Sequence, residues 1–233
     1  GYQSGLLDQK LMAKKAAEEK ALRDAVAEDS EASALYGKAW DELAAAQKSY
    51  ASLYKLYRYF EGGAGFSTTY FGTARSLVRL AFEKSLPNDA RLREYRDAAL
   101  PALNRRLTTV TPIYDELEIT NLTDSLIQLQ KEFGVRLEVR WLMAGRLAED
   151  AAKDLVQGTK LGDVEVRKRY LDGGLDAIYG SGDPMIKLAL LVDPVSRTVR
   201  KRYETEVEPV ETKIGALIAQ AMFKLRGTSI PPD

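Results

Sequence analysis

The stretch that decides the fold runs from Tyr36 to Phe60 and reads YGKAWDELAAAQKSYASLYKLYRYF. Large side chains recur in it at intervals of seven residues, and a second set follows three positions later: Tyr36, Leu43, Tyr50 and Tyr57, then Ala39, Ala46, Leu53 and Phe60. This a/d pattern is typical of a helix that packs along another helix. A helix of these ~25 residues would be roughly 37 Å long.

The residues before this stretch also favour a helix. Residues 6–28 are rich in Ala, Leu, Lys and Glu, which are strong helix formers, and Asp29-Ser30 then offers a break or a cap. We therefore expect the first two helices to pair in a long antiparallel or coiled-coil-like arm.

The rest of the chain predicts further helices, and the fold class is all-α. Helices are expected over 67–85, from the capping pair Asn88 and Asp89 to a kink or break at Pro101, and over 119–133. Residues 108–114 are rich in β-branched side chains and contain Pro112, so they predict an extended connector. The alternation in 135–141 has the period of a strand, but an isolated strand would have no partner, so a helix is favoured there.

The C-terminal part contains two helix-start signals of the same kind. Asp183-Pro184 and Asp193-Pro194 each place a capping acid before a proline. The final helix is expected to reach Arg226 and to kink at Pro209.

Composition excludes several classes of protein. The 233 residues carry 34 Lys+Arg and 34 Asp+Glu, so the net charge of zero argues against a nucleic-acid or anionic-membrane binder. No apolar run approaches the length of a membrane span. Without Cys there is no disulfide or thiolate metal site, and without His the chain cannot complete a Ser-His-Asp or Cys-His site. We expect no catalytic residue, cofactor or metal site in this chain.

The glycine-rich turn after the decisive stretch has the composition of a phosphate loop but not its context. Gly62, Gly63 and Gly65 follow a long helix, no strand precedes them, and no lysine follows. These glycines are instead expected to end the helix and to serve, with Pro101, as candidate hinges.

The aromatic and charged runs have structural interpretations. Tyr50 and Tyr57 fit the packing seam, whereas Tyr54 and Tyr59 lie off it and are the candidate contact face for a substrate or a neighbouring domain. The basic runs 167–169 and 197–203 have acidic neighbours and predict solvated faces. No pair of acids stands out, so a glycosidase has no support.

Several segments, in order along nearly the whole chain, resemble the bacterial dipeptidyl-peptidase seven and eleven family of serine exopeptidases. They are Tyr2–Leu7, Tyr59–Phe66, Ala74–Leu80, Pro87-Asn88, Arg91–Asp97, Pro112–Glu118, Gly158–Leu161, Asp183–Ile186 and Arg200–Glu204. Residues 135–146 match the family's pattern poorly.

The resemblance implies a context for the chain. In that family a chymotrypsin-like double β-barrel carries the Ser-His-Asp triad, and a helical domain inserted into the barrel covers the active-site cleft. Residues 1–233 look like this cap domain alone, and no triad residue of the family maps onto them. The implied partners are the barrel of the same polypeptide and a peptide substrate, with no nucleic acid and no membrane insertion. The resemblance also allows the complete enzyme to be a homodimer. The implied location is the periplasm or the cell surface.

Two other classes stay open at this point. A stand-alone helical scaffold could dimerise through the long helices. An enzyme that uses only carboxylates and arginines would need a deep polar pocket, which nothing in the residue spacing indicates. The start at Gly1, without Met, and the stop soon after a helix predict a piece of a longer polypeptide.

Overall fold

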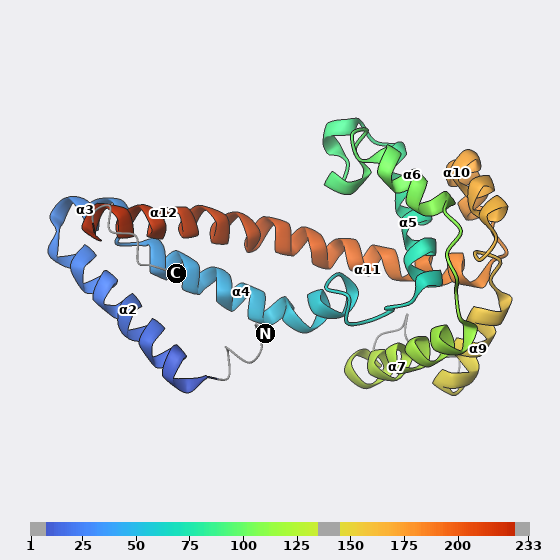
Figure 1. Cartoon of the computed structure of the whole chain (residues 1–233), viewed down its shortest axis with the longest axis horizontal. Coiled ribbons are helices and arrows are strands. Elements are labelled where there is room, and N and C mark those ends of the chain that lie inside the picture. The colour runs from blue at the N-terminus through green and yellow to red at the C-terminus, as the bar shows by residue number, and fades with distance from the viewer. Residues whose placement is uncertain (1–7, 135–144, 227–233) are drawn as a thin grey trace. The chain divides into compact units, whose positions relative to one another are not determined.

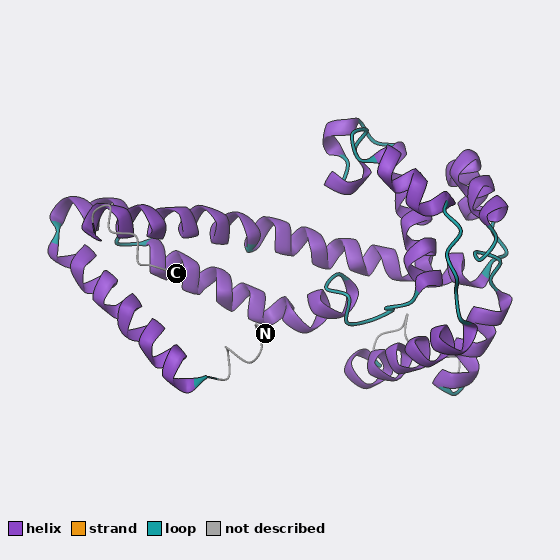
Figure 2. Ribbon diagram, viewed as in Figure 1, coloured by secondary structure: helices purple, strands orange, loops and turns teal. Residues whose placement is uncertain are grey.

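The computed structural model describes residues 8–134 and 145–226, and those residues contain helices and no strand. Figure 2 shows helices joined by turns and a few longer connectors. The α-helices are α2 (Gln9–Glu28), α3 (Ser30–Tyr36), α4 (Ala39–Phe60), α5 (Thr69–Lys84), α6 (Leu100–Thr108), α7 (Asp115–Phe133), α9 (Ala148–Gly158), α10 (Val164–Tyr179), α11 (Pro184–Glu206) and α12 (Glu208–Arg226). The all-α prediction is confirmed, and the uncertain segment 135–141 lies outside the described residues.

The chain forms two compact units. The first unit consists of residues 1–54 and 201–233, and the second consists of residues 55–200. Helices α4 and α11 each contribute residues to both units. That residues 1–233 form one cap domain inserted in a β-barrel stays a prediction.

In the first unit the expected break and heptad seam are both present. Asp29 ends α2 and caps α3, because its Oδ1 accepts a hydrogen bond from Ala32 N at 2.8 Å. Ala39, Ala46 and Leu53 are all buried along α4. The helix begins three residues later than predicted, however, because α3 ends at Tyr36 and a turn intervenes.

The partner of α4 in this unit differs from the prediction. Instead of the first helix, α4 runs antiparallel to the end of α11 and to α12 (Figure 1). The contacts between these helices run in opposite directions along the sequence: Glu42 with Lys213 at 3.6 Å, Gln47 with Glu211 at 2.5 Å, Ser49 with Glu206 at 2.6 Å, and the ring centroids of Tyr50 and Tyr203 at 5.5 Å.

Helix α2 packs only near its C-terminal end. Leu22 and Val26 are buried in a cluster with Trp40 and Ile214, whereas residues 8–21 are exposed. Lys and Glu occupy most sides of that segment, so it has little apolar surface to bury. This is why the first helix does not form the predicted pair along α4.

The second unit has α5 at the centre of its core. Most residues of α5 from Tyr70 to Glu83 are buried. The helix packs against α10, while α7 packs against α9. The core contains the large side chains Phe71, Leu80, Leu122, Leu126, Leu161, Ile178, Met185 and Ile186.

The segment between α5 and α6 departs from the predicted long helix. Asn88–Ala90 and Arg93–Tyr95 are single 3-10 turns, labelled η1 and η2. Pro101 lies in the first turn of α6, where its missing N–H leaves no helical bond unmade. It therefore starts a helix rather than breaking one. The extended connector up to Tyr114 is confirmed.

The two Asp-Pro signals have different outcomes. Asp183 caps α11 as predicted, because its carboxylate accepts from Met185 N at 2.9 Å and from Ile186 N at 3.3 Å. The second prediction is wrong, since Pro194 lies inside α11 and Asp193 binds two arginines instead. Near Pro209 the helix stops at Glu206 and α12 starts at Glu208, so a break replaces the predicted kink.

Candidate functional site

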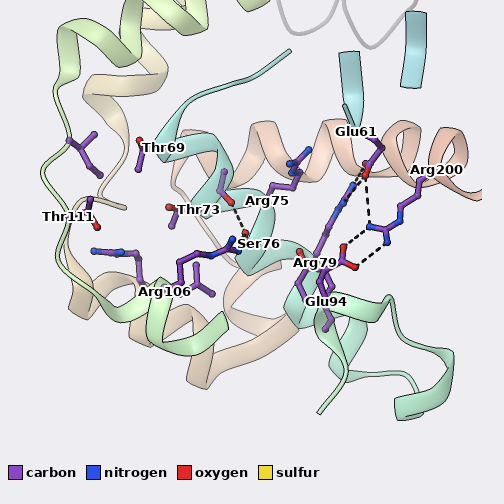
Figure 3. A pocket seen from close by; sticks show the side chains of 15 residues that line it. Glu61, Thr69, Thr73, Arg75, Ser76, Arg79, Glu94, Arg106, Thr111 and Arg200 are labelled. Atoms are coloured by element: carbon purple, nitrogen blue, oxygen red, sulfur yellow. Dashed lines mark hydrogen bonds and ion pairs between the residues drawn. The ribbon is translucent and has the colours of Figure 1, made fainter. Parts of the chain in front are cut away.

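The second unit contains a polar cavity of about 510 Å³ (Figure 3). Arginines, glutamates and hydroxyl groups dominate its wall, which is formed by Glu61, Thr69, Gly72, Thr73, Arg75, Ser76, Arg79, Glu94, Tyr95, Arg106, Leu107, Thr111, Ile113, Arg167 and Arg200. All of these residues belong to the second unit.

Helix α5 supplies one wall of the cavity. Thr69, Thr73 and Ser76 recur at intervals of four and three, so they share one face of the helix. The start of α5 is held by Glu118 of α7, whose carboxylate accepts from Thr69 N at 2.9 Å and from Tyr70 N at 2.8 Å. Negative charge is favoured at a helix N-terminus, so this contact fixes the start of α5 beside the cavity.

A buried ion-pair cluster forms one end of the cavity. Arg79 Nη2 lies 2.5 Å from Glu61 Oε1, and Arg79 Nε lies 2.6 Å from Asp193 Oδ1. The side chains of Arg79, Glu61 and Asp193 are only 4 %, 9 % and 4 % exposed. Burial acts to lower the pKa of Arg79, but the hydrogen bond and charge of Glu61 and the charge of Asp193 together raise it above its ordinary value.

The cluster extends through two further arginines of α11. Arg197 joins Asp193 to the buried Glu83, with both N–O distances at 2.5 Å. Arg200 donates to both carboxylate oxygens of Glu94, at 2.5 and 3.1 Å. The predicted solvated face is therefore wrong for Arg197 and Arg200, whereas the exposed Arg202–Glu206 pair at 2.9 Å agrees with it.

Three other arginines of the wall have only neutral partners. Arg75 donates to the Phe60 carbonyl at 3.1 Å, Arg106 to Ser76 Oγ at 3.2 Å, and Arg167 to the Thr109 carbonyl at 3.2 Å. Within 8–134 and 145–226, none of the three has a carboxylate partner. Burial, and then the neighbouring charge of Arg79, lower the pKa of Arg75.

The burial of Arg167 also contradicts the prediction that residues 167–169 lie on a solvated face. It is 5 % exposed, and its buried Nε has no hydrogen-bond partner among the described residues. Its neighbour Lys168 does follow the prediction, because it is exposed and lies 2.8 Å from Glu165.

The candidate hinge glycines form a tightly packed turn at the end of α4. Gly63 has a φ of +77°, and a Cβ on Gly65 would lie 2.5 Å from the Tyr59 ring. A Cβ on Gly62 would lie 2.9 Å from Arg58 Cα. Phe66 follows with a φ of 54° and donates its amide to Ser125 Oγ at 3.0 Å. The turn ends the helix as predicted, and hinge motion here and at Pro101 stays a prediction.

The two residues of the candidate contact face lie in different environments. Tyr59 is 2 % exposed, and its hydroxyl donates to the Ser125 carbonyl at 2.6 Å. Its ring packs against Phe60, Phe66 and Phe133, so it is covered by its own chain and is a core residue. Tyr54 is 42 % exposed, and its contact with a substrate or neighbouring domain stays a prediction.

The cavity was not apparent from the sequence, although one signal could have indicated it. Arg75 and Arg79 are four residues apart in a helix whose other residues are mostly apolar. A buried arginine needs partners, so this pair predicts carboxylates or polar groups from elsewhere in the fold. The three carboxylates Glu61, Glu94 and Asp193 are each bound to arginine, which favours binding and structure over acid-base chemistry.

The described residues also bear on metal binding and on membrane insertion. Among the described residues, no group of three or more His, Cys, Asp or Glu side chains is placed to hold a metal ion. No described helix combines the length and the apolar character that crossing a membrane requires.

Comparison with known protein families assigns the whole chain to one family. The family model described as Peptidase S46 matches residues 1–233. This is the family of dipeptidyl-peptidases seven and eleven, so the resemblance drawn from the ordered sequence segments is confirmed.

Proposed function

The chain belongs to the peptidase S46 family, and from this premise we propose that it forms a helical lid over the active-site cleft of a serine dipeptidyl-peptidase. The enzyme would release dipeptides from the free N-terminus of peptides. The match of the family to the whole chain carries the proposal, because it makes a dipeptidyl-peptidase the context of every residue described above.

Two properties of the chain support a covering role rather than a chemical one. The chain contains no histidine, so the imidazole of a Ser-His-Asp triad would have to come from residues outside it. The carboxylates of the polar cavity described above are engaged by arginines, which leaves no evident general base there. We place the triad in a β-barrel of the same polypeptide.

A helical lid could contribute by closing the cleft sterically. Closure would block peptide on one side of the scissile bond, which limits the product to a dipeptide, and would exclude water from the site during acyl transfer. Motion at the turn Gly62–Gly65 or at Pro101 is the proposed route of opening, and Tyr54 is the proposed contact residue.

We also propose the periplasm or the cell surface as the location, because such an enzyme acts on peptides outside the cytoplasm. This part of the proposal rests on the resemblance alone. Fractionation of cells that produce the complete polypeptide would check it, and a cytoplasmic pool of active enzyme would contradict it.

Hydrogen exchange tests the lid directly without changing a residue. The complete polypeptide is compared with and without a dipeptidyl inhibitor that reacts with the catalytic serine. A lid predicts slower exchange in peptides from this chain on inhibition, whereas unchanged exchange throughout 8–226 would contradict it.

Activity measurements provide the second test. The complete polypeptide should release dipeptides from a free N-terminus and leave an N-acetylated peptide intact, and the purified chain alone should release nothing. Turnover by the chain alone would overturn the proposal. Tyr54→Ala should raise KM for peptides, with Leu35→Ala as the control at another exposed apolar position.

A further inference from the structure

We propose that the cavity of the second unit binds a small oxyanion, either a carboxylate or a phosphate group, through Arg75, Arg106 and Arg167. This goes beyond the lid, because it assigns the chain a ligand of its own. It rests on the charge of the cavity, on the unmet hydrogen bonds of its wall, and on its size.

The charge of the cavity wall is unbalanced. Five arginines and two glutamates line it. The glutamates bind Arg79 and Arg200, and Asp193 lies behind Arg79. Arg75, Arg106 and Arg167 are left without a carboxylate in the described parts of the chain, so the positive excess falls on them.

Arg167 is the strongest sign of a missing ligand. A charged side chain that is 5 % exposed is costly unless its donors are bound. Its Nη1 donates to a backbone carbonyl at 3.2 Å, but its Nε, which faces no acceptor among the described residues, is buried and unpaired. An anion in the cavity that this arginine lines would supply the missing counter-charge.

Hydroxyl groups add neutral donors on the side of the cavity where Arg106 lies. Figure 3 shows Thr69, Thr73 and Thr111 at the same end of the cavity as Arg106, away from the cluster of Glu61, Arg79, Glu94 and Arg200. The hydroxyls of Thr73 and Thr111 make no hydrogen bond to a described residue. Guanidinium forks with nearby hydroxyls are the donor set that carboxylate and phosphate oxygens accept.

The size of the cavity limits the ligand. A volume of about 510 Å³ lies in the range of small-molecule sites and admits a ligand no larger than a short peptide or small organic acid. The carboxylates at the other end would repel a long polyanion. The expected ligand therefore carries one or two anionic groups.

Calorimetric titration of the full chain at low ionic strength tests the proposal. Succinate probes the carboxylate, inorganic phosphate probes the phosphate, and succinamide is the neutral analogue of succinate. The variants are Arg106→Met and Arg167→Met. Their matched controls are Arg105→Met and Arg169→Met, which remove an exposed arginine of the same helix outside the cavity wall.

We expect saturable binding of at least one anion, no binding of succinamide, and weaker binding at higher salt. Each cavity variant should bind at least about tenfold more weakly, and each control should stay within about twofold of the parent chain. Succinate binding alone would identify a carboxylate site, and phosphate binding alone a phosphate site. Because Arg106 is exposed, its variant keeps the test valid even where Arg167→Met fails to fold.

Two results would overturn the proposal. One is the absence of saturable binding for both anions. The other is binding that Arg106→Met leaves unchanged, which would mean an adventitious ion only. Neither result bears on peptide hydrolysis, so the lid and the anion site fail independently.

Discussion

Replacing Arg79 with Met should destabilise the second unit strongly, because the change leaves two buried carboxylates without their shared arginine. Glu61 and Asp193 are 9 % and 4 % exposed, and each is within 2.6 Å of Arg79. Removal of one partner from a buried ion pair costs ~3–5 kcal/mol in the free energy of unfolding. Met keeps much of the volume, so little of the loss would come from a cavity.

The remaining contacts place the expected loss at the lower end of that range. Asp193 keeps Arg197 at 2.5 Å, and Glu61 keeps the hydroxyl of Ser196 at 2.5 Å. We therefore expect ~3 kcal/mol, which corresponds to a decrease of roughly 6–12 °C in Tm for a chain of this size.

Urea unfolding followed by circular dichroism measures this loss. The control is Lys168→Met, which breaks an exposed ion pair of the same unit and should cost much less than Arg79→Met. Adding Glu61→Gln to Arg79→Met should restore part of the stability, because it removes one orphaned charge. A loss below ~1 kcal/mol for Arg79→Met, or one equal to that of the control, would refute the reasoning.

Three further predictions concern stability. Gly65→Ala should lower the free energy of unfolding by ~1–3 kcal/mol, because its Cβ would lie 2.5 Å from the Tyr59 ring. Gly72→Ala lies in a helix with open space around it and should raise that free energy by ~0.5–1 kcal/mol. The urea midpoints of the two variants measure both changes. Asp183→Ala should cost ~2–3 kcal/mol by the same measurement, because it uncaps α11 and removes the acceptor of the buried Thr159 hydroxyl. The exposed cap variant Asp163→Ala should lose under ~1 kcal/mol. Burial raises the pKa of Tyr95 to about 12 from 10.0, so the folded state holds its proton more tightly and stability should be intact below pH 10.0 and fall as the pH rises from there to about 12. Unfolding at stepped pH should show a smaller fall in Tyr95→Phe, and an equal fall would count against Tyr95 as a source.

The features that sequence predicted well are those decided locally. The seam of α4 follows from a repeat of seven, and the caps at Asp29 and Asp183 follow from a short acid next to a helix start. The end of α4 follows from glycines that permit a positive φ. These signals depend on neighbours within one or two helical turns.

The predictions that failed depended on partners far away in the sequence. Asp193-Pro194 has the same local signal as Asp183-Pro184, yet Arg79, 114 residues earlier, holds Asp193 inside a continuous helix. The basic run on α11 has acids nearby, but Arg197 also binds Glu83 and Arg200 binds Glu94, and both glutamates lie more than 100 residues earlier in the sequence. The sequence did not predict the polar cavity for the same reason, because its wall is assembled from separate segments that share no motif.

The division of the chain into units also sets an order of events during synthesis. The first unit needs residues 201–226 as well as residues 8–54, whereas the second is built from residues 55–200 alone. Domains emerging from the ribosome generally fold from the N-terminus onward. In this chain the earliest helices must wait, with Leu22, Val26 and Trp40 uncovered, until α12 has been made. We therefore expect a chaperone to bind residues 8–54 of the nascent chain until α12 covers these side chains.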